Sequence, residues 1–160
     1  MNKELQSIIR NIENVNSGEP WFGRSVFTLL EEVDESIAFV KPNDKSHSCI
    51  VLLYHMITWA EFTLKRIEKD EINDMAVFEK LDWREIDPKI HGWQKGLKLF
   101  KEIHSAIIRL LKEKVDDDKF LEEIVDYRNY KFRFMLNGLI QHNIYHAGQV
   151  AYVAKMVRKM

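Results

Sequence analysis

Apolar residues recur every three to four positions along four long stretches of the chain, a period that predicts amphipathic helices. In the first stretch, Leu5, Ile8, Ile9 and Ile12 form one such stripe. Strict apolar–polar alternation never persists for more than a few residues, so no β-strand is predicted. The four predicted helices span residues 3–15, 48–69, 90–115 and 130–157.

Shorter elements are predicted between these helices. A short helix is expected over residues 25–35, and residues 70–88 form a polar crossover with a short helix and Trp83 as its anchor. The run Asp116-Asp117-Asp118 offers an N-cap for another short turn. The chain is therefore predicted to be all-α: an antiparallel four-helix bundle with a long crossover connection and short extra helices, forming a single domain over residues 1–160.

The last predicted helix carries two histidines four residues apart, His142 and His146. At 100° per residue they share one helical face, about 40° apart, and Gln149 lies on the same face. Two imidazoles placed in this way can bind one metal ion from the same side. Gln149 is thus the best candidate to orient an imidazole through a hydrogen bond. Position 143 is Asn instead of the Glu that a zinc-protease motif would supply.

A further histidine, His55, lies at the edge of the apolar side of the second long helix, beside Trp59 and near Phe62. A third imidazole from a facing helix would complete three ligands and leave a coordination position open, as a catalytic metal requires. Trp59 and Phe62 would then wall a pocket, although both residues fit an ordinary core equally well.

The remaining candidates fit a metal site less well. His47 precedes a helix and is interpreted as a capping or loop residue, and His91 opens the third long helix. His104 lies beside Glu102 and Ser105, so we expect it to be half exposed. Cys49, the only cysteine, excludes an intrachain disulfide and is expected to be a small buried side chain and not a ligand.

These motifs resemble those of the DinB/YfiT-like bundle proteins. The segment of residues 138–150, with its HxxxHxGQ pattern from His142 to Gln149, is similar to the last-helix signature of that family. His55 followed by Trp59 is similar to its single histidine in an early helix, and residues 18–23 resemble its aromatic turn after the first helix. The resemblance covers nearly the whole chain.

The resemblance implies an antiparallel four-helix bundle, often dimeric. It also implies a divalent transition metal, which would be zinc, nickel or iron, held by His55, His142 and His146 with water completing the shell. Family members of known activity are metal-dependent thiol transferases and hydrolase-like enzymes. Three neutral imidazoles leave the full charge on the cation, which can lower the pKa of a bound water or thiol.

Charge and composition limit the kinds of partner that the protein is expected to bind. Lys and Arg number 24 and Asp and Glu 25, for a formal net charge of −1. This near-neutral charge does not indicate binding to nucleic acid. The apolar runs are too short to predict a membrane-spanning helix. Without the apolar stretch of a signal peptide at its start, the chain is expected to be cytoplasmic. The apolar arc of the last helix is wider than one core needs, which predicts a homodimer.

The sequence leaves three functions open. The first is a small metalloenzyme that acts on a small-molecule substrate, either a transferase that uses a thiol or a hydrolase. The second is a non-catalytic metal- or ligand-binding bundle of the stress-response kind. The third is a structural or interaction protein whose histidines fill the core.

Overall fold

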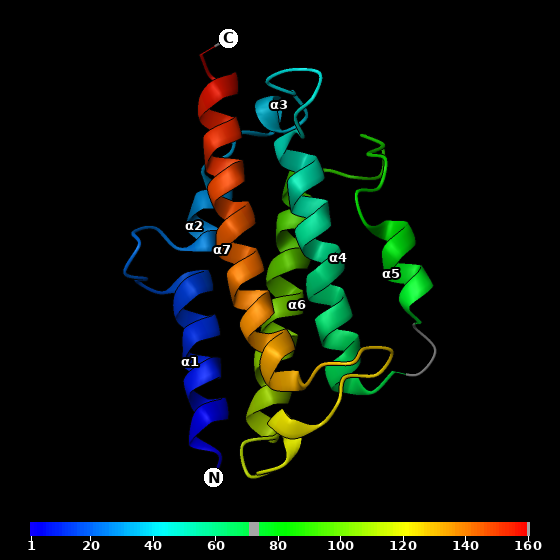
Figure 1. Cartoon of the computed structure of the whole chain (residues 1–160). Coiled ribbons are helices and arrows are strands. Elements are labelled where there is room, and N and C mark those ends of the chain that lie inside the picture. Colours follow the sequence, from blue (N-terminus) through cyan, green and yellow to red (C-terminus); the bar gives the residue numbers. More distant parts are fainter. Residues whose placement is uncertain (71–73, 160) are drawn as a thin grey trace.

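The computed structural model of the chain describes residues 1–70 and 74–159, and the regular elements of this part are all helical (Figure 1). The all-α prediction is confirmed. Residues 71–73, which belong to the predicted crossover, lie outside the described residues. The four long helices are α1 (Lys3–Ser17), α4 (Cys49–Glu68), α6 (Trp93–Glu113) and α7 (Phe132–Val157).

Polar side chains fix where the shorter elements begin. The helix predicted over residues 25–35 is in fact two, α2 (Val26–Glu31) and α3 (Glu35–Ala38). A new helix, α3, starts after α2 because the Asp34 carboxylate accepts the backbone N–H of Ser36 and so caps its first turn. The crossover contains α5 (Met75–Leu81). At the start of the short 3₁₀ helix η1 (Phe120–Glu122), the Asp117 carboxylate accepts the backbone N–H of Phe120.

The long helices lie side by side, with α4 packed against both α6 and α7, and α1 packed against the same two helices (Figure 1). Neighbours α4 and α7 run in opposite directions, as do α1 and α6. The crossover carries α5 along the outer side of α4, so that α6 starts at the same end of the molecule as α4. This return is what the long connection between α4 and α6 accomplishes.

The core lies between these four helices. The stripe predicted in α1 is buried, and Trp93 and Phe100 of α6 are fully enclosed. Each such apolar side chain contributes about 1.5–3 kcal/mol to folding through burial. Gly96 lets α6 approach α4 closely, since a Cβ there would lie 2.9 Å from the ring of Tyr54. The ring of Tyr54, one residue before His55, therefore packs directly against α6.

Among the helices of the described residues, none combines the length and the apolar character needed to span a bilayer.

Candidate metal centre

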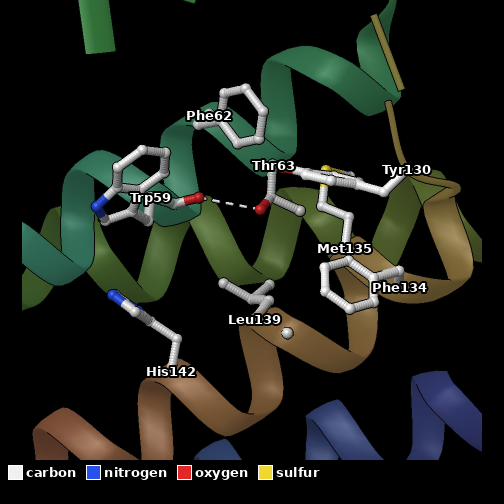
Figure 2. Close-up of a pocket in the computed structure, with 9 residues that line it drawn as sticks. Trp59, Phe62, Thr63, Tyr130, Phe134, Met135, Leu139 and His142 are labelled. Carbon is white, nitrogen blue, oxygen red and sulfur yellow. Dashed lines mark hydrogen bonds between the residues drawn. The ribbon is translucent and has the colours of Figure 1, made fainter. Parts of the chain in front are cut away.

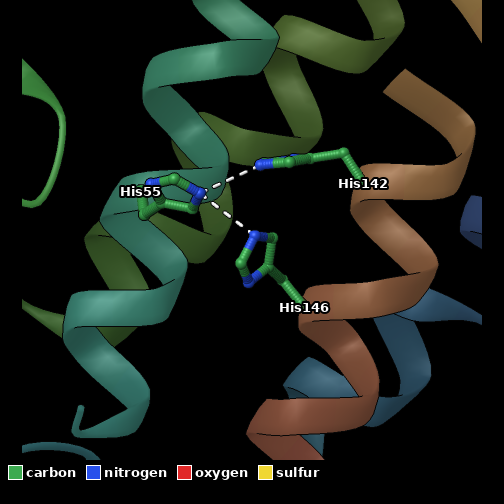
Figure 3. Close-up of side chains that lie close together, drawn as sticks. All are labelled: His55, His142 and His146. Atoms are coloured by element: carbon green, nitrogen blue, oxygen red, sulfur yellow. Dashed lines mark hydrogen bonds between the residues drawn. The ribbon is translucent and has the colours of Figure 1, made fainter. Parts of the chain in front are cut away.

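Helices α4 and α7 bring the three predicted histidines together at the middle of their shared interface (Figure 3). Nε2 of His55 lies 3.0 Å from Nε2 of His142 and 3.0 Å from Nε2 of His146. One nitrogen from each ring lies within 4.8 Å of the others. The pair on α7 comes from the spacing of one helical turn, and His55 faces it because α4 packs directly against α7.

Hydrogen-bond acceptors behind two of the rings determine which nitrogen carries the proton. Nδ1 of His55 lies 2.5 Å from Oδ1 of Asp82, and Nδ1 of His146 lies 2.7 Å from Oε1 of Gln149. Because a carboxylate only accepts, Nδ1 of His55 is the donor. The same oxygen of Asp82 also accepts the indole N–H of Trp59 at 3.2 Å. The Nε2 atoms of His55 and His146 are therefore left with lone pairs that face the centre of the cluster.

Burial keeps the three imidazoles neutral. Desolvation, together with the neighbouring His146 and His55, lowers the pKa of His142 to about 3. Desolvation also lowers the pKa of His55 and of His146, against the opposing effects of Asp82 and Gln149 respectively. At neutral pH the cluster thus presents uncharged nitrogens, which is the form that binds a metal ion.

The resulting arrangement fits a cation better than it fits hydrogen bonding alone. His142 can donate an Nε2 proton to His55, but the lone pairs of His55 and His146 then still face each other at 3.0 Å. A cation between them removes that repulsion. Two ring nitrogens bound tetrahedrally to zinc at about 2.0–2.1 Å would lie about 3.4 Å apart, close to the separations seen. Unlike Nδ1 of His55 and Nδ1 of His146, Nδ1 of His142 is buried without a hydrogen-bond partner.

The sequence predicted Gln149 as the residue that orients an imidazole and did not predict Asp82. It lies just after α5 in the crossover, and the neighbouring Trp83 stacks on the ring of His55 with 3.8 Å between centroids. His47 lies in the loop before α4, as predicted, and its ring also stacks on Trp83 with 4.3 Å between centroids, which places it near the site. The pairing of an acid with the tryptophan anchor in Leu81-Asp82-Trp83 was the available signal.

Trp59 and Phe62 line a pocket that ends at His142 (Figure 2). Both side chains come from α4, and the other wall is formed by the start of α7. Cys49 is fully buried at the first turn of α4, with its thiol 3.7 Å from the carbonyl of Val150, and it takes no part in the cluster. Burial raises the pKa of the Cys49 thiol to about 11.

The expectation that His104 is half exposed is wrong. Its side chain is buried, with Nδ1 donating to the carbonyl of Phe100 at 2.9 Å and Nε2 accepting from the amide of Asn143 at 2.8 Å. Desolvation lowers its pKa to about 4. The sequence neighbours Glu102 and Ser105 were misleading because they lie on other faces of the helix.

Comparison with known proteins agrees with this geometry. Neither a curated protein nor a solved structure matches the chain. The sequence profile described as the DinB superfamily matches residues 23–150, which is most of the chain and includes the three histidines, Asp82 and Gln149. With the helical fold and the histidine cluster already established, the match shows that the chain belongs to the DinB superfamily.

Proposed function

We propose that the protein is a divalent-metal enzyme whose ligands are His55, His142 and His146. The observation that carries the proposal is the convergence of three neutral imidazole nitrogens from two facing helices, two of them with hydrogen-bond acceptors fixed behind the ring. Acceptors of this kind orient metal-binding histidines in proteins and raise their basicity.

All-imidazole donors suit zinc, nickel, copper and iron alike, and of these we propose zinc, nickel or iron, the metals that the resemblance to the family implies. Bound there, the cation would act as a Lewis acid that lowers the pKa of a thiol or a water molecule. The reaction we propose is transfer to a thiol, with hydrolysis as the other reaction of the same chemistry.

Residues of the chain would support that reaction in distinct ways. Asp82 and Gln149 hold the rings of His55 and His146 in one tautomer and orientation. Trp83 covers one face of His55 and excludes water from it. Trp59, through its indole N–H, holds Asp82 in place while its ring forms part of the pocket wall. These are positioning residues, and the histidines are the groups that bind the cation.

A non-catalytic metal-binding protein is the alternative. It is favoured by the lining of the pocket beside His142, where the described residues include no carboxylate to serve as a general base. Such a protein would bind the cation equally well and turn over no substrate.

We further infer that the protein works as a homodimer through α7. Large apolar side chains project from its exposed side, among them Phe134, Tyr145 and Tyr152, each more than three-fifths exposed. Exposed apolar groups gathered on one helix are typical of protein interfaces.

Elemental analysis of the purified, untagged protein tests the metal proposal. We expect about one divalent ion per chain, held by three ligands as in other open metal sites. His55→Ala and His142→Ala should each remove most of it, whereas His91→Ala, outside the cluster, should not. Unchanged metal content in both cluster variants would contradict the three-histidine site.

Turnover assays then separate the enzyme from the binding protein. The metal-loaded protein is incubated with thiols plus electrophiles, and separately with esters and amides. Turnover that is abolished by chelation and by His142→Ala supports the enzyme. A protein that binds metal but converts none of these substrates supports the alternative.

A further inference from the structure

An apolar pocket of about 150 Å³ opens between α4 and the start of α7 and ends at His142 (Figure 2). It is lined by aromatic and aliphatic side chains from both helices. Its lining residues are Trp59, Phe62, Thr63, Tyr130, Phe134, Met135, Gly138, Leu139 and His142. His142 belongs to both the pocket and the histidine cluster, so the pocket leads directly to the proposed metal.

The lining offers almost nothing to a charged ligand. It contains no acidic side chain, no lysine and no arginine. The Thr63 hydroxyl is already used, because it donates to the carbonyl of Trp59 at 2.9 Å. The Arg128 guanidinium packs over the rings of Trp59, Phe62 and Tyr130 but is not itself part of the lining. A charged or strongly polar group seated against the lining would lose its hydration without gaining a partner there, at a cost of several kcal/mol. The chemistry of the wall therefore selects an uncharged, apolar group.

The volume limits the size of that group. An enclosed apolar cavity of about 150 Å³ accommodates benzene, so an open pocket of this volume has room for a ring of that size. Aromatic walls such as Trp59 and Phe62, whose rings meet edge to face at 5.7 Å, favour a flat ring that packs against them in an edge-to-face or offset manner.

We propose that this pocket binds the non-reacting group of the substrate, and that this group is a neutral, phenyl-sized apolar moiety attached next to the atom that reacts. A substrate seated in this way has its ring between Trp59 and Leu139 and its reacting atom beside His142. The assignment of a reacting atom rests on the proposed function, but binding of the apolar group depends only on the pocket.

Gly138 provides the means to fill the pocket without disturbing the helix. It lines the pocket on α7, and a Cβ placed there would meet no atom within 4 Å. Gly148 lies on the same helix, exposed, and its Cβ would also meet nothing within 4 Å, yet it lines neither the pocket nor the cluster. The two glycines form a matched pair: both substitutions raise helix propensity, but only one occupies the pocket.

In the first arm of the test, toluene is titrated into the metal-free protein and binding is monitored by NMR. Toluene should shift signals of residues that line the pocket in the wild type and in Gly148→Leu. In Gly138→Leu its affinity should fall at least about tenfold, the equivalent of 1.4 kcal/mol. Gly138→Ala, which fills less of the space, should show a smaller loss and serves if the leucine variant folds poorly.

In the second arm, two thiols, phenylmethanethiol and 2-hydroxyethanethiol, are each titrated into the cobalt-loaded protein. Binding is monitored by the visible absorption of the cobalt. The wild type and Gly148→Leu should bind the phenyl thiol more tightly, by about tenfold or more. Gly138→Leu should lose this preference and keep its affinity for cobalt.

The outcomes separate the two proposals. Toluene binding without cobalt binding would overturn the metal function and support the pocket. Cobalt binding with no toluene shifts, or with no difference between the two thiols, would overturn the pocket and support the metal function. An equal response of Gly138→Leu and Gly148→Leu would also overturn the pocket.

Discussion

Oδ1 of Asp82 lies 2.5 Å from Nδ1 of His55, joining the crossover to the middle of α4. Replacing this carboxylate by the amide of Asp82→Asn keeps the shape and removes the negative charge. Removing a hydrogen-bond partner behind a metal-binding histidine weakens metal binding about 10- to 100-fold. We expect a loss of that size for zinc, measured by competition with a chromophoric chelator. Glu85→Gln removes an exposed acid from the same segment and should leave the affinity unchanged. Equal affinities of the wild type and Asp82→Asn would contradict the role given to Asp82.

Cation binding should also stabilise the folded chain. A ligand that binds only the folded state at about 100 times its dissociation constant adds about 2.7 kcal/mol to the free energy of unfolding. We expect zinc to raise the unfolding midpoint in urea accordingly, and EDTA to reverse the effect. His146→Ala should lose most of the stabilisation, because only two of the three histidine ligands remain to bind zinc. A variant that zinc stabilises as strongly as the wild type would show that the cation binds elsewhere.

Backbone strain at Trp83 gives a third prediction. Its φ is 49°, in the left-handed region that side chains with a Cβ rarely adopt. Trp83→Ala and Trp83→Gly both remove the stacking on His55, but only glycine removes the strain. The glycine variant should therefore be more stable than the alanine variant by about 1 kcal/mol in urea unfolding. The reverse order would mean that this backbone conformation is unstrained.

His104 should make stability depend on pH. Its pKa is lowered to about 4 in the folded chain, so between that value and the ordinary 6.5 the unfolded chain binds more protons. Stability is therefore full above pH 6.5 and is lost as the pH falls towards 4. The loss between pH 7 and pH 5 that is due to His104 is about 2 kcal/mol.

Urea unfolding of the wild type and of His104→Gln at both pH values measures this contribution. The variant is expected to lose less stability on acidification, by that amount. The comparison is needed because the histidines of the cluster, whose pKa values are also lowered, act in the same direction. Parallel losses in the two proteins would exclude His104 as a source of acid sensitivity.

The helical fold could be predicted because the apolar period of each long helix repeats over several turns. The convergence of His142 and His146 follows from their spacing alone. The same reasoning would have buried His104, since Phe100, Ile107 and Leu111 lie within one or two turns of it on one face. The error came from considering residues adjacent in sequence and not those adjacent on the helix.

Asp82 and Trp83 could not be placed by such reasoning. They lie in the crossover just after α5, where no period relates a residue to the face of a distant helix. Their positions depend on how α5 packs against α4 and on a left-handed backbone at Trp83. The pocket beside His142 likewise depends on how two helices meet, and an empty space of that kind leaves no pattern in either sequence segment.

The crossover supplies Asp82 to a site whose proposed ligands all lie on long helices. Ordering of the crossover and binding of the ion are therefore thermodynamically coupled. Whatever free energy the ordered crossover adds to ion binding, ion binding must add to the ordering of the crossover. Backbone amides around Asp82 should accordingly exchange with deuterium more slowly once the cation is present, while amides in the first turns of α1, remote from the cluster, keep their rates.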